Sequence, residues 1–269
     1  MRYAREMFYR FKEHQLIFLG AQCAYFLLLS LFPFMIVMIS LLTFVPFTVD
    51  DFKMLLEDIY MPAGVTDIIE GQLESLAQDR NTGALSLGII FTLWTASLAI
   101  NAILRSLNLS FVETKRRGLI LGRLISIGLT VGMFAVVVAA LTLQVIGGQL
   151  TAWLEFDVWL MDAGLLRWLL ITLLTFGVFL VLYLIGPETR LSFRNVYIGT
   201  IFATLGWQLT TLGFSVYLSN FADYSATYGT IGAAIVLMVW FHLSALVILI
   251  GGEINAIKKE GLQWAKQPR

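Results

Sequence analysis

The sequence predicts an all-α, polytopic integral membrane protein with six transmembrane helices, and three observations lead to that fold class. Of the 269 residues, 58% are hydrophobic and only 13% are charged, with a mean hydropathy of +0.82. A water-soluble globule of this size needs more polar surface than that. Six apolar stretches are each long enough to cross a hydrocarbon core, which takes about 20 helical residues. The basic residues, finally, gather in alternate connections between these stretches.

The predicted spans follow one another without a soluble domain, so residues 1–269 form a single six-helix membrane domain. The spans cover Ala21–Val45, Ala84–Leu104, Leu124–Val145, Leu165–Ile185, Val196–Val216 and Thr230–Ile250, and the fifth is more polar than the others. The first is too long for the core of a removable signal peptide, which takes about 7–15 residues, and no small-residue cleavage site follows it. It also holds Cys23, the single cysteine, so the sequence offers no disulfide framework and no cysteine-based metal site.

Three further segments lie outside the predicted spans. Residues 1–20 interleave basic and large apolar side chains, which predicts a cytoplasmic amphipathic helix on the inner membrane surface with anionic lipid as its partner. Residues 48–82 are acidic and extracytoplasmic, and their apolar residues recur at helical spacing, which predicts short amphipathic helices. Residues 252–269 form a cytoplasmic tail.

The distribution of Lys and Arg gives the orientation. With the amino terminus inside, the cytoplasmic segments hold 15 of the 18 basic residues, and only Lys53, Arg80 and Arg167 fall elsewhere. This is the excess that the positive-inside rule expects of cytoplasmic loops. We therefore expect both termini on the cytoplasmic side.

Polar residues inside the spans indicate which helix faces point inward, because a polar group in hydrocarbon must meet protein, water or a ligand. The second span carries one polar stripe at spacings of three and four, and the fifth span carries a similar stripe, so both helices should face the bundle interior. The sixth span adds His242 and Glu253 on roughly one face. The residues expected to line a pathway are Gln22, Tyr25, Ser30, Trp94, Ser97, Asn101, Arg105, Asn108, Gln208, Thr211, His242 and Glu253.

These polar residues also have a purely structural interpretation. Single polar residues in membrane bundles commonly form interhelical hydrogen bonds, worth about 0.6 kcal/mol each, and this reading is favoured over transport or proton relay for any one of them. The fourth span has almost nothing polar beyond Thr172 and Thr175. It is therefore a lipid-facing helix or the contact face of a homo-oligomer.

The sequence argues against an enzyme. Its two histidines, His14 and His242, lie on different segments without metal-ligand spacing, and there is neither a Gly-rich phosphate loop nor a nucleophile elbow. No catalytic residue, metal site or cofactor is predicted. The basic run 115–117 is too small for a nucleic-acid-binding face. An intramembrane enzyme would need His242 and Glu253 to meet across a wet cavity.

Three stretches of the chain resemble the YihY/BrkB family of bacterial inner-membrane proteins, and the likeness covers nearly the whole sequence. They are AYFLLLSLFP at 24–33, LWTAS at 93–97 running on to Asn108, and the run from YGTIG at 228–232 to GEIN at 252–255. The resemblance implies six helices in a bacterial inner membrane. Members were long labelled ribonuclease BN, and this sequence lacks a metal-dependent nuclease site; the family is otherwise discussed as a transporter and, in some pathogens, as a serum-resistance factor.

Two functions from different classes remain. The leading hypothesis is a transporter or lipid-translocating protein for a small-molecule or lipid substrate, with a pathway between the polar stripes of the second and fifth spans. Asn101 and Gln208 would line it, Arg105 would meet an anionic headgroup or substrate, and His242 and Glu253 would handle protons or cations. The alternative is a non-transporting scaffold for envelope assembly that uses segment 48–82 and the fourth span as partner surfaces.

Overall fold

The computed structural model describes residues 2–42, 82–111, 118, 120–136, 163–220 and 223–260. All regular structure in these residues is helical, which confirms the all-α prediction for this part of the chain. The helices are α1 (Arg2–Glu13), α2 (Leu16–Leu42), α5 (Thr82–Leu109), the helix Ile120–Val136, α7 (Ala163–Ile185), α8 (Phe193–Asn220) and α9 (Asp223–Glu260). The predicted outer segment 48–82 lies outside the described residues except for Thr82, where α5 begins.

Several of these helices have the length and apolar character of membrane spans. Among the described residues, Trp168–Ile185 of α7 and Ala234–Glu260 of α9 qualify individually. The pair Arg2–Glu13 and Leu16–Leu31 qualifies jointly, with a bend of 59° between its halves, and Ile120–Val136 is apolar but shorter. The count of six spans therefore stays a prediction.

A sharp break separates α1 from α2. Gln15 adopts a left-handed backbone conformation with φ of 50°, which a non-glycine residue rarely adopts and which ends a helix. The amide of Gln15 still bonds the carbonyl of Lys12, and the amide of Phe18 bonds the carbonyl of Gln15, so the break is a tight turn. The predicted amphipathic helix of residues 1–20 is thus shorter than expected, since α2 already begins at Leu16.

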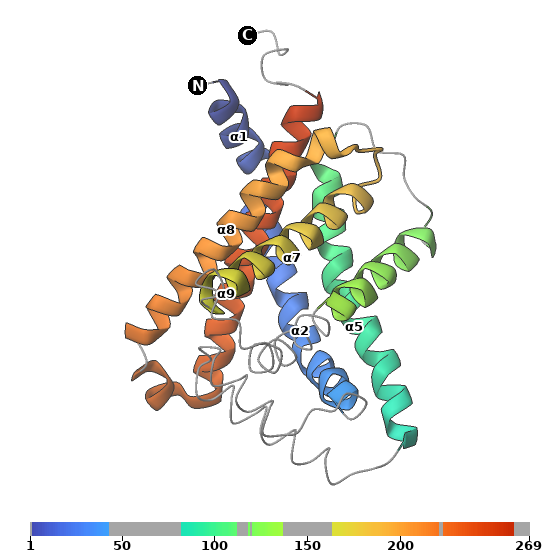
Figure 1. Ribbon diagram of the computed structural model, residues 1–269, viewed down its shortest axis with the longest axis vertical. Helices are drawn as coiled ribbons and strands as arrows, with labels where there is room; N and C mark the ends of the chain where they lie inside the picture. Colours follow the sequence, from blue (N-terminus) through green and yellow to red (C-terminus); the bar gives the residue numbers. More distant parts are fainter. Residues whose placement is uncertain are drawn as a thin grey trace.

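The long helices pack in a row. In the described residues α2 packs between α5 and α9, α9 also packs against α8, and α7 packs against α8 (Figure 1). The buried core runs through these contacts, with Ile103 and Leu107 of α5, Tyr183 of α7 and Leu249 of α9 all at most 3% exposed. The helix α1 stands beside the carboxyl end of α9 at one end of the molecule (Figure 1).

Small residues let α8 and α9 approach closely. A Cβ atom added at Gly199 would lie 2.1 Å from the carbonyl oxygen of Gly251, and one at Gly251 would lie 2.8 Å from the carbonyl oxygen of Gly199. The same contact is reinforced where the amide of Gly199 donates to Oδ1 of Asn255 at 2.9 Å. Glycine at these two positions therefore sets the α8–α9 distance, as small residues do in membrane bundles.

Candidate functional site

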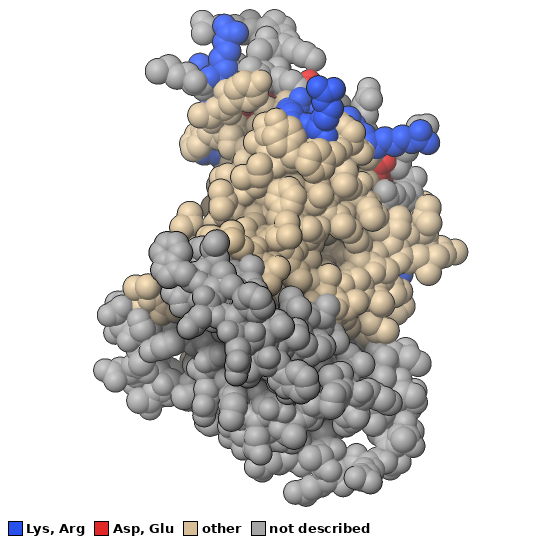
Figure 2. Space-filling view, in the orientation of Figure 1, with Lys and Arg blue, Asp and Glu red and all other residues tan. Residues whose placement is uncertain are grey.

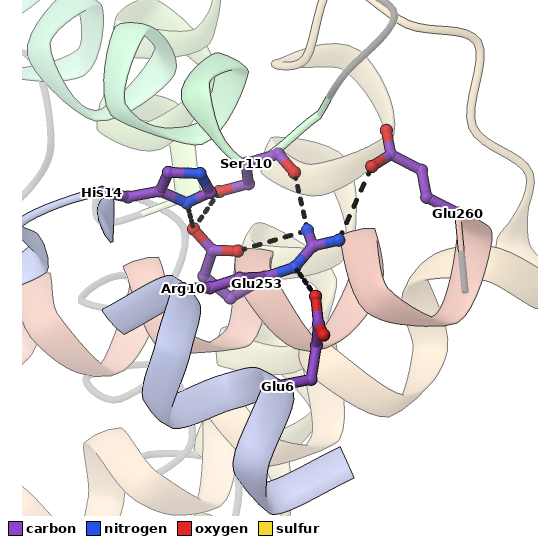
Figure 3. Close-up of polar contacts among 6 residues, drawn as sticks. All are labelled: Glu6, Arg10, His14, Ser110, Glu253 and Glu260. Carbon is purple, nitrogen blue, oxygen red and sulfur yellow. Dashed lines mark hydrogen bonds and ion pairs between the residues drawn. The ribbon is translucent and has the colours of Figure 1, made fainter. Parts of the chain in front are cut away.

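A buried ionic cluster joins three helices at the end of the molecule where α1 meets α9. It comprises Glu6 and Arg10 of α1, His14 of the following turn, Ser110 after α5, and Glu253 and Glu260 of α9 (Figure 3). Arg10 is 1% exposed, and Glu6 and Glu253 are 0% exposed. Charges are so rarely buried to this extent that the arrangement requires mutual pairing.

Arg10 occupies the centre of this ionic cluster. Its Nε donates to Oε1 of Glu6 at 2.9 Å, across one turn of α1. Its Nη1 donates to the carbonyl oxygen of Ser110 at 3.0 Å and lies 3.6 Å from Oε2 of Glu253, while Nη2 lies 3.8 Å from Oε2 of Glu260. One guanidinium thereby connects α1, the end of α5 and the end of α9, which its forked geometry suits.

Glu253 receives two further partners in the ionic cluster. Nδ1 of His14 lies 2.5 Å from its Oε1, and the Ser110 hydroxyl donates to the same oxygen at 2.9 Å. His14 is 21% exposed on its side chain, so it connects this buried carboxylate to the surface. The histidine that contacts Glu253 is thus His14, whereas the sequence grouped Glu253 with His242 on the same helix.

Basic residues surround the same end of the molecule. Nζ of Lys258 donates to the carbonyl oxygen of Arg194 in the first turn of α8, and Nζ of Lys259 donates to the hydroxyl of Thr189 in the α7–α8 connection, so the two lysines join α9 to these neighbours. Figure 2 shows Lys and Arg gathered at this end and an almost uncharged surface over the described middle of the molecule. This is the pattern of a helical bundle that meets water at one end and lipid along its sides.

A second set of polar groups lies further along α8 and α9. Nε2 of Gln208 donates to the Thr172 hydroxyl of α7 at 2.7 Å, but its Oε1 has no partner. The hydroxyl of Thr211 and Nδ1 of His242 are likewise buried without a hydrogen-bond partner. His242 faces α2, since a Cβ at Gly20 would lie 3.4 Å from its Cε1 atom. Oγ of Ser244 and Nδ2 of Asn255, both on α9, are also buried without a hydrogen-bond partner.

The expected pathway residues of α2 and the outer part of α5 have varied surroundings. Gln22 and Tyr25 are exposed in this structure. Ser30 and Ser97 are buried, but each hydroxyl donates to a carbonyl of its own helix, at Leu27 and Trp94. Such bonds satisfy the hydroxyl locally and leave little for a solute.

The rest of the α5 stripe points in more than one direction. Trp94 and Arg105 are exposed, Asn101 is half-buried, and Oδ1 of Asn108 accepts from the amide of Glu188 at 2.7 Å. In the described residues α5 and α8 have no extensive contact with each other, whereas α9 packs against both of them. A pathway lined by the stripes of α5 and α8 therefore stays a prediction, with α9 standing between them.

Several residues of the ionic cluster were not singled out from the sequence. Glu6 and Arg10 have the i, i+4 spacing of a helical ion pair, which is a readable signal, but nothing in the sequence says that this pair faces inward. His14 and Ser110 lie at helix ends far from Glu253 along the chain, and only the fold brings them together. In the described part of the chain no group of three or more His, Cys, Asp or Glu side chains could hold a metal ion.

The bundle of apolar helices, the uncharged flank and the basic end define an integral membrane protein. Within that class, the family description "Virulence factor BrkB" matches residues 7–268, so the chain belongs to the BrkB family. The resemblance read from the first, second and sixth spans is thereby confirmed.

Individual relatives agree with this assignment. The chain is 43% identical to the "ribonuclease-like protein YfkH" of Bacillus subtilis (strain 168), covering 96% of this chain and 95% of that protein. It is 33% identical to a UPF0761 membrane protein of Aliivibrio salmonicida (strain LFI1238), covering 90% and 78%, and 29% identical to one of Pseudoalteromonas translucida (strain TAC 125), covering 87% and 78%. No solved structure matches the chain.

Proposed function

We propose that this chain is a six-span protein of the bacterial inner membrane, with both termini cytoplasmic, that acts as a transporter or lipid-translocating protein. The orientation is supported by the basic residues, which lie at the end where α1 meets α9 (Figure 2). The ionic cluster of Arg10 and Glu253 then closes the cytoplasmic end of the bundle. Its buried charges hold α1 in place between α9 and the end of α5.

The observation that carries the transport proposal is the set of unpartnered polar atoms on α8 and α9. Glu253 lies eleven residues beyond His242, so His242 is about 16 Å deeper along α9, near the middle of a core about 30 Å thick. At that depth Oε1 of Gln208, the Thr211 hydroxyl and Nδ1 of His242 have no hydrogen-bond partner. An unsatisfied polar group in hydrocarbon costs several kcal/mol. Water or a passing polar solute would satisfy all three.

Thiol accessibility tests this proposal directly, because the chain has a single native cysteine. Cys23→Ala gives a thiol-free background in which Gln208→Cys and Thr211→Cys are introduced singly. Intact cells and inverted membrane vesicles are then treated with a membrane-impermeant cationic methanethiosulfonate reagent. Leu209→Cys, at a position 68% exposed on the outside of α8, and Ala203→Cys, at a fully buried position, are the matched controls.

We expect both pathway thiols to react with the reagent while both control thiols stay unmodified, because Leu209 faces hydrocarbon and Ala203 is packed. Lys259→Cys at the cytoplasmic end reports that the reagent works in inverted vesicles. If the Lys259→Cys thiol reacts and neither pathway thiol does from either side, the proposed water-filled pathway is wrong. With a positive result, dithionite quenching of a fluorescent phosphatidylglycerol in proteoliposomes distinguishes lipid translocation from solute transport.

A membrane scaffold is the second candidate, and α7 is the observation that favours it. In the described residues α7 packs against α8, and only 17% of its apolar segment Trp168–Ile185 is buried. Leu169 and Leu173 of α7 are 52% and 68% exposed. A scaffold predicts that crosslinking through a cysteine at Leu173 in the Cys23→Ala background captures a second copy or another membrane protein. Recovery of uncrosslinked chain alone would count against this function.

A further inference from the structure

The start of α8 and the end of α9 bring two basic residues to one corner of the molecule (Figure 1). Nζ of Lys258 donates to the carbonyl oxygen of Arg194, so the two residues lie side by side. Arg194 is exposed, and Lys258 is half-buried. Among the described residues neither side chain has a carboxylate at ion-pair distance, whereas Arg10 has three. This basic corner, formed by Arg194 and Lys258, therefore carries positive charge that no neighbouring carboxylate balances.

Two aromatic rings of α8 lie directly beside the basic corner. Nζ of Lys258 stands 3.6 Å from the centroid of the Tyr197 ring, in cation–π geometry. The ring of Phe193 stacks on that of Tyr197, with the two centroids 6.1 Å apart. Both residues are exposed, Phe193 to 55% and Tyr197 to 37%. A cation held over an exposed tyrosine ring suits the headgroup level of a membrane, where aromatic rings lie between water and lipid.

An exposed apolar face of α8 continues from these rings along the helix. Its residues follow Tyr197 at spacings of three and four, so they share one side of α8. They are Ile198, Ile201, Leu205, Leu209, Leu212 and Val216, each between 41% and 68% exposed. Leu209 lies twelve residues beyond Tyr197, which is about 18 Å along the helix. That length exceeds half of a hydrocarbon core about 30 Å thick, which is the depth of one leaflet.

We propose that the basic corner and the exposed face of α8 together bind an anionic phospholipid of the cytoplasmic leaflet. Arg194 and Lys258 pair with the headgroup phosphate, because basic side chains at the inner surface attract anionic lipid and form charge-assisted hydrogen bonds with phosphate oxygens. The acyl chain lies along the apolar face, which a free phosphate compound would leave uncovered. The site relies on the cytoplasmic placement of this end proposed above, but it does not require the chain to transport anything.

Lipid binding to the purified full-length protein in detergent micelles tests this site. Micelles have no leaflets, so the result does not depend on the proposed orientation or on transport. Native mass spectrometry measures the apparent Kd of the first bound lipid, for phosphatidylglycerol and for zwitterionic phosphatidylcholine. The variants are Arg194→Gln and Lys258→Gln. Lys12→Gln is the matched control, because the Lys12 ammonium also lies near an aromatic ring, 4.5 Å from the Phe8 centroid, but on α1. Size-exclusion chromatography checks folding, and the exposed position of Arg194 keeps the test valid if Lys258→Gln folds poorly.

We expect Arg194→Gln and Lys258→Gln each to weaken phosphatidylglycerol binding about fivefold, the contribution of one basic side chain near an anionic membrane surface. Lys12→Gln should change it less than about twofold, and none of the three variants should change phosphatidylcholine binding by more than that. If Arg194→Gln and Lys258→Gln bind phosphatidylglycerol no more weakly than Lys12→Gln, or lose both lipids equally, the proposed site does not exist. If glycerol phosphate, measured by isothermal titration calorimetry, binds as tightly as phosphatidylglycerol, the apolar face contributes nothing and the assignment to a lipid is wrong.

Discussion

Replacing Arg10 with methionine should release α1 from the bundle. The substitution keeps an unbranched apolar stem but removes the guanidinium that pairs with Glu6 and Glu253. Both carboxylates are 0% exposed, so they would be left buried without this charge partner. Breaking a buried ion pair from one side typically costs about 3–5 kcal/mol. The bundle avoids that cost by letting α1 swing into solvent, where the carboxylates are hydrated.

The magnitude of this effect can be read from hydrogen exchange. A helix of 12 residues such as α1 is marginal in isolation, so its amide protection depends on docking. A loss of 3–5 kcal/mol corresponds to an increase of about 10²- to 4 × 10³-fold in the undocked population. We therefore expect the amides of α1 to exchange faster by about that factor, up to the rate of a free helix. The measurement is deuterium uptake of the peptide 2–13 in lipid nanodiscs.

Two comparisons make this prediction refutable. Lys12→Gln removes an exposed charge from the same helix and should change exchange by less than about fivefold, because surface charges contribute at most about 1 kcal/mol. Adding Glu253→Gln to Arg10→Met removes one of the stranded carboxylates and should restore part of the protection, as double-mutant coupling predicts. If Arg10→Met exchanges no faster than Lys12→Gln, the ionic cluster does not hold α1.

Two further predictions concern the packing of α9 against α8 and against α7, and both are measured by unfolding in mixed SDS micelles. Gly199→Ala should destabilise the bundle by about 1–3 kcal/mol, because the added methyl would lie 2.1 Å from the Gly251 carbonyl oxygen. The control is Gly213→Ala, whose added methyl meets nothing within 4 Å and should not destabilise the bundle. Equal effects at both glycines would show that α8 and α9 are not in close contact. Tyr183→Phe removes the buried hydrogen bond of 2.6 Å from the Tyr183 hydroxyl to the Ile248 carbonyl oxygen. The free energy of unfolding should fall by about 0.6 kcal/mol, and by at most about 1.7 kcal/mol. An unchanged free energy of unfolding would mean that this bond is absent in lipid.

Hydropathy located helices better than it located their ends. The sixth span was expected to end at Ile250, but α9 continues to Glu260. Residues such as Glu253 and Asn255 read as a polar tail in the sequence, yet they are 0% and 1% exposed. The part of the tail up to Glu260 belongs to the bundle, where Oε1 of Glu253 meets His14 and Oδ1 of Asn255 accepts from the amide of Gly199. The mean hydropathy of a stretch of sequence records how polar its residues are, but not whether the fold supplies hydrogen-bond partners for them.

The candidate site was predictable only in part for the same reason. Glu253 was identified because a carboxylate next to an apolar span demands an explanation. The sequence placed it only with His242, on roughly one face of the same helix, because single-helix geometry is all that a sequence pattern supplies. The actual partners, Arg10 and His14, approach from α1 and from the turn at Gln15. That turn could not be predicted, because its left-handed residue is a glutamine and not the glycine that usually marks such a conformation.

The ionic cluster also explains an unusual feature of α1. An amphipathic helix ordinarily turns its apolar face to the protein, yet α1 buries Glu6 and Arg10 and leaves Phe8 61% exposed. Its outward face also carries Tyr9 and Lys12, with the Lys12 ammonium 4.5 Å from the Phe8 ring centroid. Aromatic and basic side chains together suit the headgroup level of a membrane. The polarity of α1 is thus reversed because its charged face meets Glu253 inside the bundle while its aromatic face is left for lipid.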